Sequence, residues 1–489
     1  MATAYDLIVI GAGPGGYPAA LRAAELGRRT AVIECRVLGG TCLNRGCIPT
    51  KTLLHATGLY RETLKASEAG LRAESLELDG PALRARKNQV VETLQNGIAA
   101  QFKKHKVDVY YGIGTIEGEH LVTVTPNKVA EELSEEPSAG PQTGAPVETS
   151  GNQPSALIHL EAANILIATG STPAAPPIPG SGLEGVADSD IMLEEVDMSL
   201  KSLVIIGGGV IGMEFAQIYS DIGCQVTVLE AMDRILPGMD REIAQNLKMI
   251  GKKRNIDIHT GAMVKEIQKT SDGFLLCRYE EKGAEKEAAG ERVLIATGRR
   301  PNTSNLFGES MKGRIAETRG CIQVDDHYRT SVPGIYAIGD VIGGIQLAHA
   351  ATAEGITAVE HLFGCKPRYS TALIPSCVYT DPEIAVIGKT SEEAKEAGIE
   401  VITGKYLMSM NGKSLLSGQE RGFIKLTAEK GSRQVIGAQL MCARATDMIS
   451  TLELAIQNHL TVEQLAELIL PHPTFCEGIG EAAFDMAER

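Results

Sequence analysis

The sequence predicts an α/β fold built around two Rossmann-like dinucleotide-binding units. A short apolar run, a glycine-rich turn and a helical pattern occur in this order at 6–26 and again from residue 203. Each unit also ends in nearly the same amino-acid sequence, at 165–170 and 293–298. Such an internal duplication indicates two separate nucleotide sites, for two cofactors or for one cofactor and one mobile cosubstrate.

The length and charge of the chain narrow the classes of function. Its 489 residues allow two to four domains, and its 43% of hydrophobic residues is ordinary for a globular protein. The formal net charge is −14 and no long Lys/Arg run occurs, so nucleic acid and membrane surfaces are poor candidate partners. No stretch reaches transmembrane length and no leader region precedes the first strand, so we expect a cytoplasmic protein.

The ten cysteines do not predict a structural disulfide framework, because disulfides are rare in long chains of the reducing cytoplasm. Eight of them are scattered, and we expect these to be reduced packing residues. None has zinc-ligand spacing, so no metal site is expected. The eight are Cys35, Cys224, Cys277, Cys321, Cys365, Cys377, Cys442 and Cys476.

The first unit carries a complete dinucleotide fingerprint after the apolar strand at 6–10. Gly11 makes the tight turn, Gly13 lets a pyrophosphate approach, and Gly16 lets the helix pack on the strand. The phosphates then lie at the helix N-terminus. The next strand ends in Glu34, 23 residues after Gly11, where a carboxylate accepts hydrogen bonds from an adenosine ribose.

Two cysteines, Cys42 and Cys47, follow this unit directly and are separated by four residues. They are either a redox-active disulfide that relays electrons to a cofactor or a pair of buried free thiols. Their place after a nucleotide unit favours the redox disulfide. Glycines around the pair let the backbone pass close to a flat ligand, and Lys51 supplies a positive charge where a reduced flavin carries a negative one.

The segments between the two units have a mixed character. Amphipathic patterns predict helices at 51–66 and 83–104, and a β-rich region follows at 107–125. Residues 129–156 are rich in Pro, Glu, Ser, Gly and Thr and contain neither Lys nor Arg. We interpret them as a solvated, flexible insert with no part in the chemistry.

The second unit repeats the fingerprint with Gly207, Gly209 and Gly212, and its second strand ends in Glu230. Glu230 again lies 23 residues after the first glycine. A carboxylate there repels a 2′-phosphate, which favours NAD over NADP. Arg234 follows four positions later and argues the other way, but we interpret it as a surface or salt-bridged residue.

Two candidate residues lie further along the chain. A strand pattern at 334–340 ends in Asp340, which can hold a ribityl or ribose hydroxyl, cap the next helix, or do both. From residue 372 strands and helices alternate without a nucleotide motif. His472 precedes Glu477 by five residues, and that carboxylate can orient the imidazole and make it a better base. The alternative is a structural histidine.

Taken in order, these motifs resemble those of the pyridine nucleotide–disulfide oxidoreductases. The resemblance covers nearly the whole chain except residues 129–156. It implies an FAD domain at 1–172, an NAD domain at 173–300, a second FAD segment at 301–371 and a C-terminal α+β dimerisation domain at 372–489. The matching motifs are 11–17, 42–47, 207–214, 296–302, 339–340, 472–474 and Glu477.

The resemblance also implies which residues contact the two cofactors. For FAD they are Gly11, Gly13, Gly16, Glu34, Lys51, Gly114, Asp340 and Ala348. For NAD they are Gly207, Gly209, Gly212, Glu230, Val264 and Gly298, with Glu214 beside the nicotinamide.

The branch of the family that the chain resembles most oxidises protein-bound dihydrolipoamide with NAD⁺. The implied partners are a second copy of the chain, in a homodimer, and a lipoylated carrier protein or lipoyl domain of a multienzyme complex. Cys47 is then the thiol against the flavin, and Cys42 exchanges with the substrate. His472, held by Glu477, is the base and comes from the other subunit.

The sequence departs from the family pattern at two places. Leu470-Pro471 stands where many members have His-Ala, which puts the shape of the substrate channel in question. Arg45 lies between the cysteines where a small apolar residue is usual, and it favours a lowered thiol pKa or an acidic substrate. Two alternatives therefore remain, a reductase of another disulfide on the same scaffold and a non-catalytic cofactor-binding subunit.

Overall fold

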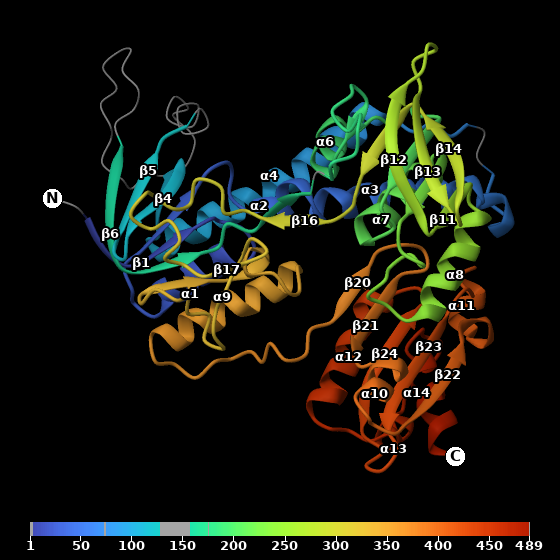
Figure 1. Ribbon diagram of the computed structural model, residues 1–489. Coiled ribbons are helices and arrows are strands. Elements are labelled where there is room, and N and C mark those ends of the chain that lie inside the picture. The colour runs from blue at the N-terminus through green and yellow to red at the C-terminus, as the bar shows by residue number, and fades with distance from the viewer. Residues whose placement is uncertain (1–2, 73–74, 128–156, 175, 489) are drawn as a thin grey trace. The chain divides into compact units, whose positions relative to one another are not determined.

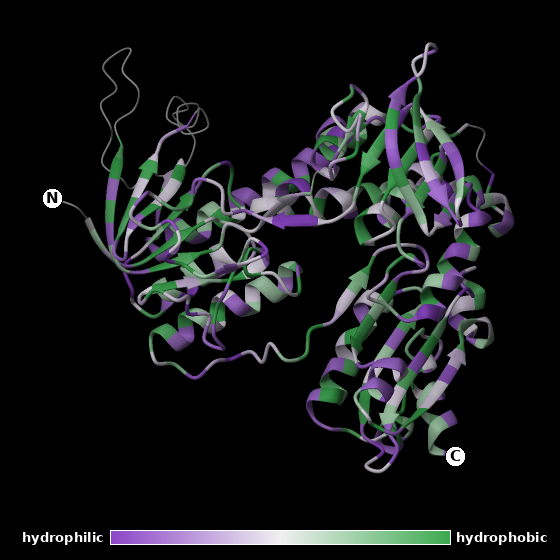
Figure 2. Ribbon diagram, in the orientation of Figure 1, coloured by the Kyte–Doolittle hydropathy of each residue, from purple (hydrophilic) through white to green (hydrophobic). Residues whose placement is uncertain are grey.

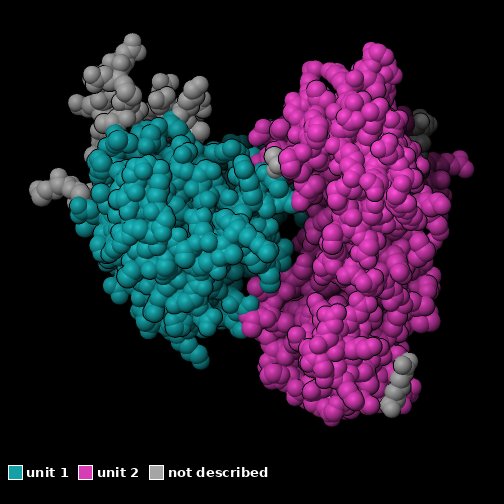
Figure 3. All heavy atoms as spheres, viewed as in Figure 1, with its two compact units in different colours: residues 1–52, 81–174, 298–371 teal, residues 53–80, 175–297, 372–489 magenta. Residues whose placement is uncertain are grey.

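The chain folds as a mixed α/β protein, which confirms the predicted fold class (Figure 1). This structure is a computed structural model that describes residues 3–72, 75–127, 157–174 and 176–488. The predicted insert at 129–156 lies outside the described residues. Two compact units can be distinguished (Figure 3): unit 1 comprises residues 1–52, 81–174 and 298–371, and unit 2 comprises residues 53–80, 175–297 and 372–489. The finer division into four segments stays a prediction.

Unit 1 is organised around a seven-stranded sheet in the order β3-β2-β1-β6-β5-β4, with β19 paired to β6. The strands β1, β2, β3, β6 and β19 pair in parallel, and β4 and β5 add an antiparallel edge. Leu7 and Ile8 of β1 are fully buried in two different core clusters, so both faces of the sheet are covered. The strands are β1 (Thr3–Ile10), β2 (Thr30–Glu34), β3 (Asp108–Tyr111), β4 (Ile113–Gly118), β5 (Leu121–Thr125), β6 (Ile158–Ile167) and β19 (Ile335–Ala337).

The helices of unit 1 position its glycine-rich turn and its cysteines. They are α1 (Gly16–Glu25), α2 (Gly40–Arg45), the start of α3 (Cys47–Leu64), α4 (Gly80–His105), η2 (Gly339–Ile342) and α9 (Ala348–Leu362). The helix predicted from residue 51 begins earlier, at Cys47. Pro49 does not prevent this start, because a proline in the first turn of a helix removes no intrahelical hydrogen bond.

The first half of unit 2 repeats the arrangement of unit 1 in a sheet of order β11-β10-β9-β15-β8, in which all pairs are parallel. Its elements are β8 (Val186–Ala187), α6 (Ser189–Glu195), β9 (Ser202–Ile206), α7 (Val210–Asp221), β10 (Gln225–Glu230), α8 (Arg241–Lys252), β11 (Ile256–Thr260) and β15 (Arg292–Ile295). An antiparallel sheet of β12 (Ala262–Lys269), β13 (Leu275–Glu281) and β14 (Ala284–Gly290) stands beside it, and β14 is largely hydrophilic (Figure 2). The fold predicted for the second dinucleotide-binding unit is therefore confirmed.

The C-terminal part of unit 2 is a five-stranded antiparallel sheet in the order β20-β21-β24-β23-β22. Leu426 and Leu440 are fully buried on the face that packs against α12 and α14. Its elements are β20 (Ser376–Val378), β21 (Ile384–Gly388), α10 (Ser391–Glu396), β22 (Val401–Leu407), η3 (Met408–Met410), α11 (Gly412–Leu416), β23 (Phe423–Glu429), β24 (Val435–Met441), α12 (Ala445–Gln457), α13 (Val462–Ala466) and α14 (Glu477–Ala487). In the part of the chain that the structure describes, no helix combines the length and the apolar character needed to cross a membrane.

Candidate functional site

A disulfide joins Cys42 and Cys47, so these cysteines are not a pair of free thiols. Cys42 lies on α2 and Cys47 is the first residue of α3, and their Cα atoms are 4.7 Å apart. Gly46 lies between the two helices. A Cβ at this position would be 3.0 Å from the Thr41 carbonyl oxygen and 3.2 Å from the Cα of Cys42. A side chain at this position would therefore be tightly packed against the segment that carries Cys42.

The segment with the disulfide is attached to the first glycine-rich turn. The Gly39 N–H donates to the Ala12 carbonyl over 2.9 Å, and a Cβ on Gly40 would lie 2.5 Å from the Cα of Gly13. Asn44 holds the other side, because its amide donates to the Gly40 carbonyl over 2.8 Å. The disulfide therefore lies directly beside the first nucleotide fingerprint. The role of Asn44 as an anchor was not predicted from the sequence, although its amide binds carbonyls only four and six positions away.

The first glycine-rich turn has the geometry that the fingerprint predicts. Gly11 has φ +103°, and a Cβ there would lie 2.4 Å from the Ala168 carbonyl oxygen. A Cβ on Gly16 would lie 1.9 Å from the Gly11 carbonyl oxygen, so α1 can pack this closely only without a side chain. Among the residues that the structure describes, a Cβ on Gly13 would have one neighbour within 4 Å, an atom of Gly40 at 3.7 Å. The backbone around Gly13 is thus accessible for a phosphate, as expected.

Glu34 closes this turn from the end of β2. It is 6% exposed, and its carboxylate accepts hydrogen bonds from the N–H groups of Ala12 and Arg36, each over 2.8 Å. Burial raises the pKa of Glu34, and the two N–H groups oppose this by favouring the charged form. Contact with a ribose stays a prediction.

The N-terminus of α9 completes the surroundings of the first turn. The Thr352 hydroxyl donates to the Pro14 carbonyl over 2.8 Å, one helical turn after the first residue of α9, Ala348. A Cβ on Gly355 would lie 2.4 Å from the Gly15 carbonyl oxygen. Helices α1 and α9 therefore pack side by side (Figure 1). The N–H groups at the N-terminus of a helix suit an anionic ligand, and α9 begins at Ala348 beside this turn.

Asp340 lies in η2 and does not cap the following helix, so that part of the prediction is wrong. The residue before α9 is Leu347, whereas the Asp340 carboxylate accepts a hydrogen bond from the Ser171 hydroxyl and lies 4.0 Å from Arg299. The neighbouring Gly339 N–H donates to buried Glu354 over 2.7 Å. These partners come from distant segments, which is why the sequence did not reveal them. A contact of Asp340 with a ribityl hydroxyl stays a prediction.

The remaining residues predicted to contact FAD are Lys51 and Gly114. Lys51 lies in the first turns of α3 and is half-buried, four positions after Cys47. Gly114 lies on β4, and a Cβ there would be 3.2 Å from both Ile10 and Ile33. Close packing between β4 and the parallel strands therefore already explains this glycine. Whether either residue contacts a flavin is untested.

The second glycine-rich turn repeats the φ angle and the close contacts of the first. Gly207 has φ +111°, and a Cβ there would lie 2.4 Å from the Ala296 carbonyl oxygen. A Cβ on Gly212 would lie 2.0 Å from the Gly207 carbonyl oxygen. Glu230 is 8% exposed and accepts hydrogen bonds from the N–H groups of Gly208 and Met232, over 2.6 and 2.7 Å.

The surroundings of the second turn leave room for a ligand. Within the described residues, a Cβ on Gly209 or on Gly298 would have no neighbour within 4 Å. Val264 is 8% exposed and packs in a core cluster, so a contact of this residue with a nucleotide would involve its backbone. Arg234 donates to the Pro237 carbonyl over 3.0 Å and is neither fully exposed nor paired with a carboxylate in the interactions that the structure records.

Glu214 lies in the second turn of α7 and is 2% exposed. Its Oε1 accepts a hydrogen bond from the Tyr379 N–H over 3.1 Å. A buried carboxylate close to the second nucleotide turn agrees with a place beside the nicotinamide, which stays a prediction.

His472 and Glu477 form a hydrogen-bonded pair in unit 2, with 2.8 Å between Nδ1 and Oε1. The other oxygen of Glu477 accepts from the Thr474 N–H over 2.8 Å, and this bond, followed by the one to His472, lowers the pKa of Glu477. The His472 side chain is 77% exposed, so it is not a packed structural histidine. Buried Asn411 donates to the Thr474 carbonyl over 3.0 Å and holds this segment in place, a role that the sequence did not indicate.

Comparison with known protein families decides the assignment. The family described as pyridine nucleotide-disulphide oxidoreductase matches residues 5–355, and its dimerisation domain matches residues 374–483. The chain belongs to this family.

Relatives in the family share nearly the full length of the chain. Dihydrolipoyl dehydrogenase from Bacillus subtilis strain 168 is 38% identical over 490 residues, which cover 99% of this chain and 98% of the relative. The mitochondrial dihydrolipoyl dehydrogenase from Dictyostelium discoideum is 37% identical, with coverage of 99% and 94%.

Solved structures of similar shape include more than one kind of protein. LpdA from Mycobacterium tuberculosis has a TM-score of 0.84 at 27% identity, with 98% of this chain and 99% of that chain covered. The HOCl-induced flavoprotein disulfide reductase RclA from Escherichia coli, in its Cu(II) complex, has a TM-score of 0.82 at 27% identity and covers 99% of each chain.

As a pyridine nucleotide-disulphide oxidoreductase, the chain is a flavoprotein with a redox disulfide, and the family resemblance predicted from its motifs is confirmed. Family membership implies FAD and a pyridine nucleotide as cofactors. The residues fit both, because each glycine-rich turn offers an open backbone and a buried carboxylate at the end of the second strand.

Proposed function

We propose that this oxidoreductase oxidises protein-bound dihydrolipoamide to lipoamide and reduces NAD⁺. The observation that carries the proposal is the similarity, along nearly the whole of both chains, to proteins named dihydrolipoyl dehydrogenase at up to 38–39% identity. The Cys42–Cys47 disulfide and the His472–Glu477 pair supply the groups that the reaction needs. FAD, when bound, carries two electrons from the reduced cysteines to the nicotinamide.

His472 is the proposed base. Glu477 accepts the hydrogen bond from Nδ1 of the imidazole, so Nε2 is left with the lone pair that takes a proton from a substrate thiol. The lowered pKa of Glu477 keeps this carboxylate charged, which fixes the ring and stabilises the imidazolium that forms. Asn411 and the Thr474 N–H hold the segment on either side.

The cysteines then carry out two thiol–disulfide exchanges. The substrate thiolate attacks Sγ of Cys42, the Cys42–Cys47 bond breaks, and Cys47 leaves as a thiolate. The second substrate thiol then attacks the substrate sulfur bound to Cys42, and its proton passes to the Cys42 sulfur as that sulfur leaves. Cyclic lipoamide is released, Cys42 becomes a thiol, Cys47 stays a thiolate, and the first proton remains on His472. The substrate has lost two electrons, and the reduced cysteine pair holds them.

We propose that the enzyme is a homodimer in which His472 of one chain serves the disulfide of the other. The family's dimerisation domain matches residues 374–483, and the segments around His472 leave large apolar side chains exposed. Ile469 is 99% exposed and Leu416 is 63% exposed, which is unusual for a surface that faces only water. A second copy of the same surface would bury them. The lipoyl group would arrive on a lipoylated carrier protein or lipoyl domain.

A direct assay separates this proposal from a second candidate, a reductase of a different disulfide. That candidate is favoured by the similarity to the flavoprotein disulfide reductase RclA and by Arg45, whose charge lies between the two cysteines and would suit an acidic substrate. We expect NADH-dependent reduction of free lipoamide and of a lipoylated carrier protein, with kcat/KM at least a hundredfold above that for glutathione disulfide. The reverse order would favour the second candidate.

A histidine variant tests the proposed base. His472→Gln should lower dihydrolipoamide oxidation by about 10²–10⁴-fold, the range that a general base contributes. Electron transfer from NADH to an artificial acceptor should persist, since it needs no substrate thiol. His459→Gln is a matched control, because His459 is also an exposed histidine of unit 2. Equal turnover of lipoamide by both variants would contradict the role of His472.

A further inference from the structure

One face of α7 carries three buried polar residues that the proposed chemistry uses only in part. Glu214, Gln217 and Asp221 lie three and seven positions apart, so their side chains project from the same face of the helix. Their exposed fractions are 2%, 6% and 4%. Buried polar side chains at this spacing need partners, and the segment 379–381 together with Arg61 supplies them.

The backbone of segment 379–381 binds this face of α7 at two points. The Tyr379 N–H donates to Oε1 of Glu214 over 3.1 Å, and the Asp381 N–H donates to Oε1 of Gln217 over 2.6 Å. Two such bonds, one helical turn apart, set both the distance and the register of the segment along the helix.

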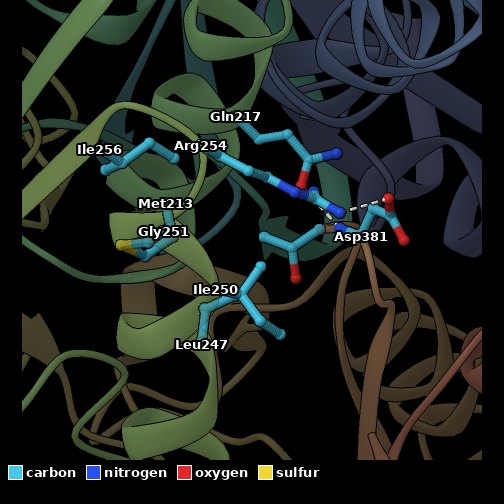
Figure 4. Close-up of a pocket in the computed structure, with 9 residues that line it drawn as sticks. Met213, Gln217, Leu247, Ile250, Gly251, Arg254, Ile256 and Asp381 are labelled. Atoms are coloured by element: carbon cyan, nitrogen blue, oxygen red, sulfur yellow. Dashed lines mark hydrogen bonds and ion pairs between the residues drawn. The ribbon is translucent and has the colours of Figure 1, made fainter. Parts of the chain in front are cut away.

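Two arginines hold the segment through the side chain of Asp381. Arg61 and Arg254 both bind its Oδ2, and the Arg254 bond measures 2.7 Å. The other nitrogen of the Arg61 guanidinium binds Asp221 over 2.8 Å, so one arginine joins Asp381 to α7. Figure 4 shows Gln217 and Arg254 converging on Asp381 from one side of a small pocket.

We propose that Asp381 is a positioning residue for Glu214, and hence for hydride transfer from the reduced nicotinamide. The inference rests on the part of the proposed function that places Glu214 beside the nicotinamide. Asp381, held by Arg61 and Arg254, fixes the segment that ends in the Tyr379 N–H. That N–H fixes the Glu214 carboxylate, which cannot reorient freely because it is buried. Ion pairs of this kind are weak evidence for a role in stability, so the proposal rests on the geometry that they fix.

The test compares Asp381→Asn with Asp240→Asn in the holoenzyme. Asp240 is the matched control, because it also forms an ion pair within unit 2, to Lys425 over 2.8 Å, and lies next to α8 instead of α7. Asparagine keeps the N-cap at this position. The measurement is rapid-mixing reduction of the flavin by NADH with no disulfide substrate present, analysed as a limiting rate and a dissociation constant for NADH.

We expect Asp381→Asn to lower the limiting rate about tenfold, with the dissociation constant changed less than threefold, because a misplacement of less than 1 Å is felt in the rate of the chemical step. Asp240→Asn should leave both within twofold. Gln217→Leu, which removes only the acceptor of the Asp381 N–H, should slow the limiting rate in the same direction by a smaller factor, and it provides the test if Asp381→Asn does not fold.

Two outcomes would overturn the inference. One is an equal slowing in the Asp381 and Asp240 variants, and the other is a limiting rate within twofold of the wild type in both Asp381→Asn and Gln217→Leu. A wild-type enzyme that NADH does not reduce would instead refute the proposed function. A wild-type enzyme that NADH reduces, but that does not use lipoamide, would change the substrate and leave Asp381 with its role.

Discussion

The two glycine-rich turns of this chain share a backbone and differ in what surrounds them. Gly11 and Gly207 have φ angles of +103° and +111°, and each leaves 2.4 Å between a Cβ position and a carbonyl oxygen of the strand that closes its unit. Glu34 and Glu230 each accept two backbone N–H groups. The repeat in the sequence is therefore a repeat in hydrogen bonding and in close approach.

The neighbours of the two turns are different. The first turn is covered by the segment at Gly39–Gly40 on one side and by α9 on the other, with a hydrogen bond from Thr352 to Pro14. At the second turn, a Cβ on Gly209 would meet no described atom within 4 Å. The two turns therefore share a fingerprint and differ in how the rest of the protein packs around them.

The largest expected effect is at Gly13, in the enclosed turn. A Cβ there would lie 3.7 Å from Gly40 and no closer to any other described residue, so Gly13→Ala should fold but place a methyl group where the pyrophosphate of FAD approaches. We expect FAD affinity to fall at least a hundredfold and all activities to be lost with it. The absorbance of the purified protein, before and after addition of FAD, measures this.

Gly209→Ala is the matched change in the open turn, and its effect should be smaller and confined to the second nucleotide. The added methyl group meets no described atom of the protein within 4 Å, so the fold and the bound FAD should persist. The KM for NADH should rise at least tenfold. If Gly209→Ala lost FAD while Gly13→Ala kept it, the assignment of the two turns would be reversed.

Of the two buried glutamates, Glu230 is the one whose charge should determine the preference between NAD and NADP. A 2′-phosphate in place of the ribose hydroxyl would meet this carboxylate, and one unfavourable charge contact corresponds to about 1.4 kcal/mol, or tenfold in kcat/KM. We therefore expect NAD to be preferred over NADP at least tenfold. Glu230→Gln removes the charge and should narrow that preference to within a few-fold. Equal kcat/KM of the wild type for the two nucleotides would contradict the proposed role of Glu230.

The sequence predicted what short-range spacing determines. The strands, the two turns and the cysteine pair depend on residues within about thirty positions of each other, and the patterns there predicted them directly. Several partners of the site residues come from other segments of the chain. Gln95 donates to Asn44, Ser171 donates to Asp340, and the Gly339 N–H in η2 donates to Glu354. A helix cap was one of the two roles considered for Asp340, and the fold does not use it, because Leu347 precedes α9.

The smallest expected effect concerns the ends of the helices that follow the two turns. The side chain of Glu25, at the end of α1, is 44% exposed and pairs with Arg22. Asp221, at the end of α7, is 4% exposed, and its Oδ2 has no hydrogen-bond partner among the described residues. Burial raises the pKa of Asp221 from 3.8 to about 6, although Arg61 and Arg254 favour its charged form.

Because this pKa is higher in the folded protein than in the unfolded chain, the folded state binds more protons between about pH 4 and pH 6. The contribution of Asp221 to stability is therefore greatest below that range, falls as the pH rises through it, and stays constant above about pH 6.

Asp221→Asn cannot titrate, so relative to the wild type it should gain a few degrees in unfolding temperature between pH 4.5 and pH 7. Thermal unfolding of both proteins across this range is the measurement. Glu25→Gln serves as the control from the first unit, and its difference from the wild type should stay flat. A difference for Asp221→Asn that does not change with pH would show that this carboxyl titrates as it does in water, and the contrast between the two helix ends would then be one of packing alone.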